Sequence, residues 1–246
     1  MSTRLRSGRG TLLCAALLAA CSGPQRPAGV AALDAAAPHN APIASPSAPI
    51  DLDGTWVAAG ADDRLQPVGD KPAFTPAGRK LYDAHRRAAA RGNRSWDATR
   101  RCLPPGLPRV LAMAQPFEVA VDPHLLLMSF QLQRLVRFVY LDDAYPGSGE
   151  ATFLGESHGH WDGRALLIET GNFKAGQVLD GTGLPAGARL KVSERLELAD
   201  DGTLVDHVTV DDEEMYQHPW QAELRFRRSS QAVREDVCVE RAGQRP

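Results

Sequence analysis

The sequence lacks the glycine patterns that bind nucleotide phosphates, because it contains neither a Rossmann G-x-G-x-x-G nor a P-loop. Its N-terminal apolar stretch, Thr11–Ala20, is only about half as long as a membrane-spanning helix requires. Charge of neither sign dominates, since 28 Lys and Arg stand against 30 Asp and Glu. The arginine pairs are scattered and not interleaved with aromatic residues, so we predict no nucleic-acid partner.

The N-terminus is organised like a bacterial export signal. Arg4, Arg6 and Arg9 precede the apolar stretch, and small residues lead up to Cys21. Leu18-Ala19-Ala20-Cys21 resembles a lipobox, in which the cysteine is acylated before the leader is cut off ahead of it. The resemblance implies a palmitate-bearing lipid anchor at Cys21. An ordinary signal peptide with an incidental cysteine is the alternative.

These signals divide the chain into three predicted segments. Residues 1–20 form a lipoprotein signal peptide, residues 21–50 a disordered Ala- and Pro-rich tether, and residues 51–243 a folded domain. The residue after Cys21 is Ser22, where the sorting pattern of enteric bacteria places Asp in proteins kept at the inner membrane. That resemblance implies the periplasmic face of the outer membrane, with the membrane as a partner through the anchor.

Hydrophobic alternation with a period of two dominates the chain after residue 116, which predicts successive strands. With a first strand at residues 54–58 and a last one at 233–240, about ten strands follow one another through short turns. We therefore predict a mostly β fold, an antiparallel meander that forms a barrel or a strongly curled sheet. One N-terminal helix is expected from Thr75-Pro76 onward, with Thr75 as its N-cap. Gly54-x-Trp56 resembles the opening of lipocalin-like barrels.

Two cysteines remain once the leader and the acylated Cys21 are set aside. Cys102 lies in a proline-rich loop and Cys238 near the end of the domain. In an oxidising periplasm two such thiols favour a disulfide. A pair of free buried thiols is the alternative.

The segment Gly155 to Asn172 carries the most reactive side chains. Asp162-Gly163 predicts a hairpin turn, and Glu156, His158 and His160 alternate along its first arm, on one face of a strand. Two imidazoles and a carboxylate at this spacing can hold a metal ion such as zinc. The alternative is a polar strand face in solvent, and we expect no other cofactor.

One predicted strand carries a carboxylate on its apolar face. Glu194 is in register with apolar residues on both sides, so it must be buried, and it is then either protonated or matched by a partner. Asp206, Glu169, His207 or an arginine of another strand are the candidate partners. It serves either as a structural lock or as the group that orients a ligand.

Several motifs, in order, are similar to a group of exported, β-rich bacterial proteins with which no activity is associated. They cover about residues 51–240: RCLPxGxPR at Arg101–Arg109, Pro116-Phe117-Glu118, GxSxGxWDG at Gly155–Gly163, Glu194-Arg195, and Tyr216 with Pro219-Trp220. The group often has His at the position of Glu156 and Arg at that of His160. The resemblance implies an exported β domain and no mechanism.

Three functions remain open. The first is the binding of a small apolar ligand or envelope component in a barrel cleft, with Glu194, Trp161 and Trp220 as contacts. The second is a lyase, isomerase or hydrolase that uses the buried carboxylates Glu169 and Glu194 with His158 or His207 as acid and base. The third is a structural envelope or assembly factor, which a filled barrel interior and an exposed apolar patch would favour.

Overall fold

The computed structural model describes residues 48–60, 62–142, 145 and 147–238. The predicted signal peptide, Cys21 and nearly all of the predicted tether lie outside the described residues. Ile50, placed at the end of that tether, is 4% exposed and belongs to the core. In the part of the chain that is described, no helix is long and apolar enough to cross a membrane.

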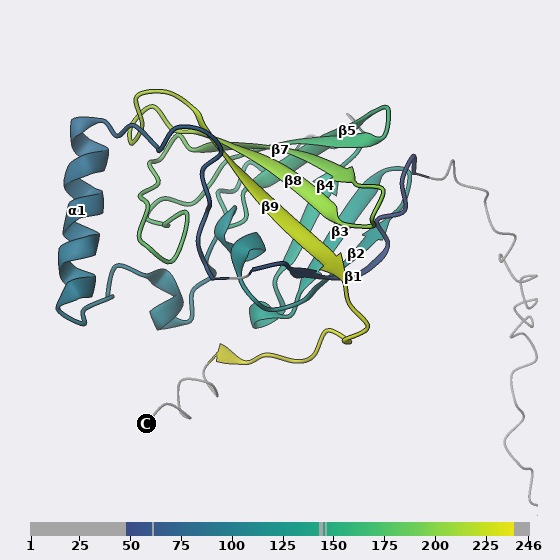
Figure 1. The fold of residues 1–246 in the computed structure, drawn as a ribbon, viewed down its shortest axis with the longest axis horizontal. Helices are drawn as coiled ribbons and strands as arrows, with labels where there is room; N and C mark the ends of the chain where they lie inside the picture. The colour runs from purple at the N-terminus through teal and green to yellow at the C-terminus, as the bar shows by residue number, and fades with distance from the viewer. Residues whose placement is uncertain (1–47, 61, 143–144, 146, 239–246) are drawn as a thin grey trace, which may run out of the picture. The chain divides into compact units, whose positions relative to one another are not determined.

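Nine strands close into a barrel in sequence order, with β1 pairing with β9 (Figure 1). The mostly β barrel expected from the alternating pattern is confirmed. The strands are β1 Gly54–Ala58, β2 Phe117–Val121, β3 Leu125–Phe130, β4 Val136–Tyr140, β5 Glu156–Asp162, β6 Ala165–Gly171, β7 Lys191–Leu198, β8 Leu204–Asp211 and β9 Trp220–Arg228.

Two details of the predicted meander are wrong. The expected last strand at 233–240 is not a strand over its described residues 233–238. The pairing of β4 with β5 is parallel and comprises only Val139 with Ser157 and Tyr140 with His158. A parallel pair needs a connection that carries the chain back along the first strand, and residues 141–155 are long enough to do so. The barrel therefore has one short parallel seam among antiparallel pairs.

The strands bury alternate residues, as their sequences predict. In β9 the buried side chains are Trp220, Ala222, Leu224 and Phe226, and β2, β3 and β7 follow the same period. Gly163 turns β5 into β6 with a positive φ of 60°, which confirms the Asp-Gly hairpin.

One α-helix lies within the described residues, α1 (Pro76–Ala90), and it begins where predicted. The Thr75 side chain accepts a hydrogen bond from the Gly78 amide at 3.0 Å, and Pro76 occupies the first turn. Figure 1 shows α1 beside the barrel, with loops between it and the strands. It packs through Tyr82, which stacks on Phe74, and through His85, which contacts Trp96.

The chain ends of the barrel are tied together at Trp56. This side chain is fully buried, its indole N–H donates to the Leu52 carbonyl at 2.9 Å, and the Arg228 guanidinium lies 4.6 Å from its ring centroid. Arg228 also donates to the Asp51 and Asp53 carbonyls, so β9 holds the segment that enters β1. The Gly-x-Trp opening thus serves barrel closure.

Candidate functional site

A buried ion pair lies inside the barrel. The Arg137 guanidinium of β4 donates to both carboxylate oxygens of Glu194 on β7, at 2.9 Å for the Nη1–Oε1 bond, and both side chains are almost completely buried. It also donates to the Ser157 hydroxyl at 3.1 Å and to the Thr170 hydroxyl at 3.0 Å. Glu194 therefore has the arginine partner from another strand that its register required, and the pair joins β4, β5, β6 and β7.

Asp206 of β8 is a second carboxylate beside this pair. It is 1% exposed, and its Oδ1 atom has no hydrogen-bond partner among the described residues. Burial raises the pKa of Asp206 well above its usual range, and the charge of Glu194 raises it further, against the opposing charge of Arg137. Asp206 is held as the neutral acid over a wider pH range than an exposed aspartate.

Replacing Asp206 with asparagine is expected to change how stability depends on pH. Because the folded-state pKa lies above the unfolded value near 3.8, wild-type stability falls as the pH rises from that value towards the folded pKa. The difference in the free energy of unfolding between Asp206→Asn and wild type should grow in favour of the variant across that window, by about 1.4 kcal/mol per pH unit. Urea unfolding from pH 4 to 7 measures it, with Asp200→Asn at an exposed turn as the control. Parallel profiles for wild type and Asp206→Asn would contradict it.

The four candidate catalytic residues lie on two sides of the barrel wall. Glu194 faces the interior, whereas His158 and Glu169, which are cross-strand neighbours, face outward. His207 is also on the outer surface, 3.5 Å from Glu223. The expectation that Glu169 is buried is wrong, since it is exposed and accepts a hydrogen bond from Ser193. The structure thus places His158 and Glu169 opposite each other on neighbouring strands and separates Glu194 from both.

The predicted metal ligands lie on the outer face of β5, but only two of them touch. His158 Nε2 is 3.3 Å from the Glu156 carboxylate, whereas His160 is exposed further along the strand. Among the described residues no group of three or more His, Cys, Asp or Glu side chains is placed to hold a metal ion. The alternating pattern predicted the shared face correctly.

The predicted ligand contacts do not converge on one site. In the strand register, Trp161 is aligned through β6 with Leu196, and Trp220 is aligned through β8 with Val192. Leu196 and Val192 lie two residues to either side of Glu194 along β7. Trp161 lines a cleft of about 420 Å³ beside the segment that enters β1, whereas Trp220 is buried against Tyr216. Trp161, Trp220 and Glu194 therefore lie at three separate sites in the protein.

A different cleft, of about 470 Å³, lies where β4 and β5 meet, and we call it the seam cleft. Because β4 pairs with β5 only at its end, the edge of β4 before Val139 faces this cleft and no strand among the described residues. Val136 and Phe138 point outward and are 42% and 47% exposed. The cleft is lined by Pro104, Leu135–Phe138, Tyr140, Tyr145, Ser148, Glu150–Glu156 and Lys174.

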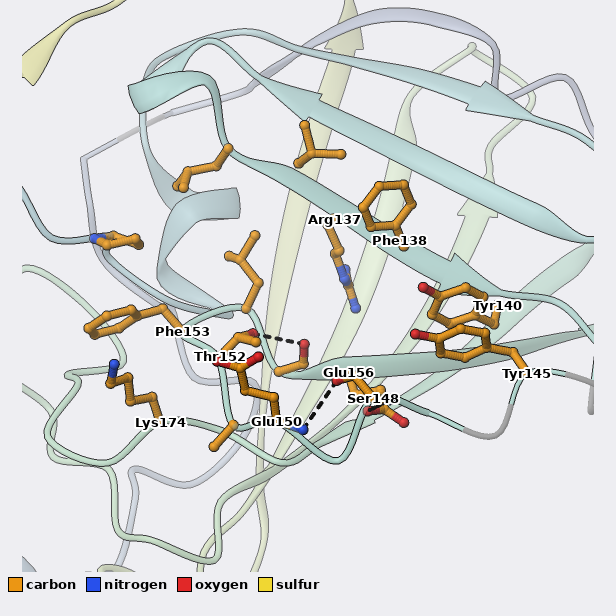
Figure 2. A pocket seen from close by; sticks show the side chains of 16 residues that line it. Arg137, Phe138, Tyr140, Tyr145, Ser148, Glu150, Thr152, Phe153, Glu156 and Lys174 are labelled. Carbon is orange, nitrogen blue, oxygen red and sulfur yellow. Dashed lines mark hydrogen bonds between the residues drawn. The ribbon is translucent and has the colours of Figure 1, made fainter.

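Aromatic side chains lie at both ends of the seam cleft (Figure 2). Tyr140 and Tyr145 stack with ring centroids 3.5 Å apart at one end. Phe153 lies at the other, with the Lys174 ammonium 5.6 Å from its ring centroid. Aromatic faces of this kind offer large apolar contact area with polar edges.

Polar groups also line the seam cleft. The Glu156 carboxylate accepts a hydrogen bond from the Ser148 amide at 3.1 Å, and the hydrogen bond from His158 lowers the pKa of Glu156. A hydrogen bond with Tyr145 raises the pKa of Tyr140 to about 12. Gly147 permits this closure, because a Cβ there would overlap the Glu156 carboxylate. The rim thus carries the Glu156 carboxylate on the same side of the cleft as Tyr140 and Tyr145.

A second buried ion pair anchors the proline-rich loop. Arg109 is 3% exposed and donates to Asp97 and to Asp63, with bonds of 2.7 to 3.0 Å. Burial acts to raise the pKa of Asp97, but the hydrogen bonds and charge of Arg109 outweigh it, so the pKa is lowered. The predicted disulfide between Cys102 and Cys238 is present in the same region. Sequence reasoning missed this cluster.

No protein-family model matches the chain, and no curated protein matches it. The fold and site define the protein only as a closed, mostly β barrel with an ion-paired interior and a cleft on its outer wall. The resemblance to a group of exported bacterial proteins stays a prediction that rests on the motifs.

Proposed function

We propose that the protein is a lipid-anchored periplasmic lipoprotein that binds a small, largely apolar molecule of the envelope in the seam cleft. The observation that carries this proposal is the exposed aromatic and aliphatic lining of a cleft about 470 Å³ in volume. Small-molecule sites typically measure roughly 300–1,000 Å³ and combine apolar walls with a few polar groups.

The position of the cleft favours the outer wall over the barrel interior as the binding place. Inward-facing side chains belong to the hydrophobic core or to the polar cluster around Arg137, which includes Glu194 and Asp206. Phe138, in contrast, is half exposed although it is a large apolar residue. An apolar ligand against Phe138 and Tyr140 would remove that surface from water, with its polar end at Glu156 or Lys174.

Native mass spectrometry of the protein purified from its own host tests the proposal. We expect a bound molecule of low polarity in wild type and its loss in Phe138→Thr/Tyr140→Thr, which keeps strand propensity but removes both rings. Val68→Ala, at an exposed apolar residue away from the cleft, should retain the ligand. Retention by the double variant, or wild type without a bound molecule, would contradict the proposal.

The free edge of β4 favours one second candidate, an assembly factor. A strand edge flanked by the exposed Val136 and Phe138 can pair with an extended segment of another envelope protein. Crosslinking through a photoreactive residue at position 138 distinguishes the two functions. A crosslinked protein partner and no small molecule would support assembly.

A further inference from the structure

Basic residues gather in one short part of the chain. Residues 76–101 contain eight Lys and Arg and two Asp, whereas the rest of the chain contains 20 Lys and Arg against 28 Asp and Glu. All eight basic residues are exposed: Arg79, Lys80, Arg86, Arg87, Arg91, Arg94, Arg100 and Arg101. Arg79, Lys80, Arg86, Arg87 and Arg91 lie on α1 or at its C-cap, and the other three lie in the segment that follows, which ends in a 3-10 helix at Ala98–Arg101.

The acidic residues of this part do not neutralise it. Asp97 is buried against Arg109, and Asp83 lies 3.8 Å from Arg79. None of the ion pairs within the described part of the chain involves Lys80, Arg86 or Arg87. Charge of one sign therefore remains uncompensated over most of the helix.

Helical periodicity places two of these charges, Lys80 and Arg87, away from the protein. Gly78, Tyr82 and His85 face the loops on which α1 packs, and a Cβ at Gly78 would overlap the Met215 carbonyl. Lys80 and Arg87 are two helical turns apart and so share one side, turned away from Gly78 and Tyr82. Figure 1 shows this helix at the edge of the domain, with one long side facing away from the barrel.

We propose that the outward side of α1 binds an anionic phospholipid surface. An exposed row of unpaired Lys and Arg on a helix is the charge pattern that negatively charged membranes attract, with each residue contributing about fivefold in affinity. Nucleic acid fits less well, because the two aromatic residues of this part, Tyr82 and Trp96, pack against Phe74 and His85 and offer no stacking surface. The contact would orient the barrel at the membrane, independently of what the seam cleft binds.

Vesicle sedimentation tests this surface. The unit Ala44–Pro246 contains all nine strands, α1 and the disulfide. It is assayed beside the full chain with Cys21→Ser, so that the proposed lipid anchor does not contribute to vesicle binding. Vesicles of phosphatidylcholine with about one third phosphatidylglycerol are compared with phosphatidylcholine alone, at low and high salt. We expect binding only to the anionic vesicles, and its loss as the Debye length shortens from about 10 Å at 0.1 M towards 3 Å at 1 M salt.

Two matched charge-reversal variants decide the outcome. Lys80→Glu/Arg87→Glu should weaken vesicle binding at least about 20-fold, since each position contributes about fivefold. Arg164→Glu/Arg227→Glu makes the same change in net charge at exposed barrel residues and should leave binding within about twofold. Equal binding to neutral vesicles, equal weakening by both variants, or wild-type affinity in the helix variant would each overturn the proposal. Circular dichroism confirms that both variants keep their fold.

Discussion

Replacing Arg137 with methionine is expected to lower the free energy of unfolding by about 3–5 kcal/mol, because it leaves a buried carboxylate without its partner. Glu194 would lose both guanidinium bonds, and Asp206 would lose the positive charge that opposes the rise of its pKa. The hydroxyls of Ser157 and Thr170 would also lose a donor. Urea unfolding followed by circular dichroism measures the effect.

Two further variants show whether the loss comes from the buried pair. Arg134→Met removes an arginine whose ion pair with Glu235 is exposed, so its effect should stay below about 1 kcal/mol. Arg137→Met/Glu194→Leu removes both charges and should recover much of the loss, since an apolar pair can replace a buried ion pair. A loss below about 1 kcal/mol in Arg137→Met alone would show that water or a shifted side chain satisfies Glu194.

The interior of the barrel was largely predictable from the sequence. Period-two alternation identified the strands, and the position of Glu194 among apolar residues showed that it is buried with a partner. The same signal exists at Arg137, which is in register with Leu135 and Val139, and at Asp206, in register with Leu204 and Val208. An arginine and a carboxylate that both lie on inward faces can be matched by their opposite charges. Arg137 and Glu194 can be matched in this way although they are 57 residues apart in the chain.

The seam cleft was not predictable, because it depends on pairing between strands. Nothing in the sequence of β4 or β5 shows that they run parallel with only two residue pairs, and the alternation is the same in an antiparallel pair. The outward direction of Phe138 follows from the alternation along β4, whereas its place in a cleft depends on this missing overlap. The stacking of Tyr145 on Tyr140 likewise depends on the path of the connection between the strands.

Removing the disulfide with Cys102→Ala/Cys238→Ala is expected to cost about 2–5 kcal/mol, because the bridge joins residues 136 positions apart and restricts the unfolded chain. Besides the bridge, polar contacts join the described end of the chain to residues 131–134. The Gln133 amide donates to Asp236 at 2.8 Å, the Arg234 amide to Gln131 at 3.1 Å, and the Arg134–Glu235 pair is exposed. Hydrogen exchange should therefore rise first in residues 229–238.

Reductant provides the matched control for the disulfide. Dithiothreitol should lower the unfolding free energy of wild type by the same amount as the double substitution and should leave the double variant unchanged. The barrel strands should keep their exchange protection, because Arg109 still binds Asp63 and Asp97 and holds the proline-rich loop without the bridge. If reduced wild type were as stable as the oxidised protein, the ion pairs of Arg109, and not the disulfide, would hold the proline-rich loop in place.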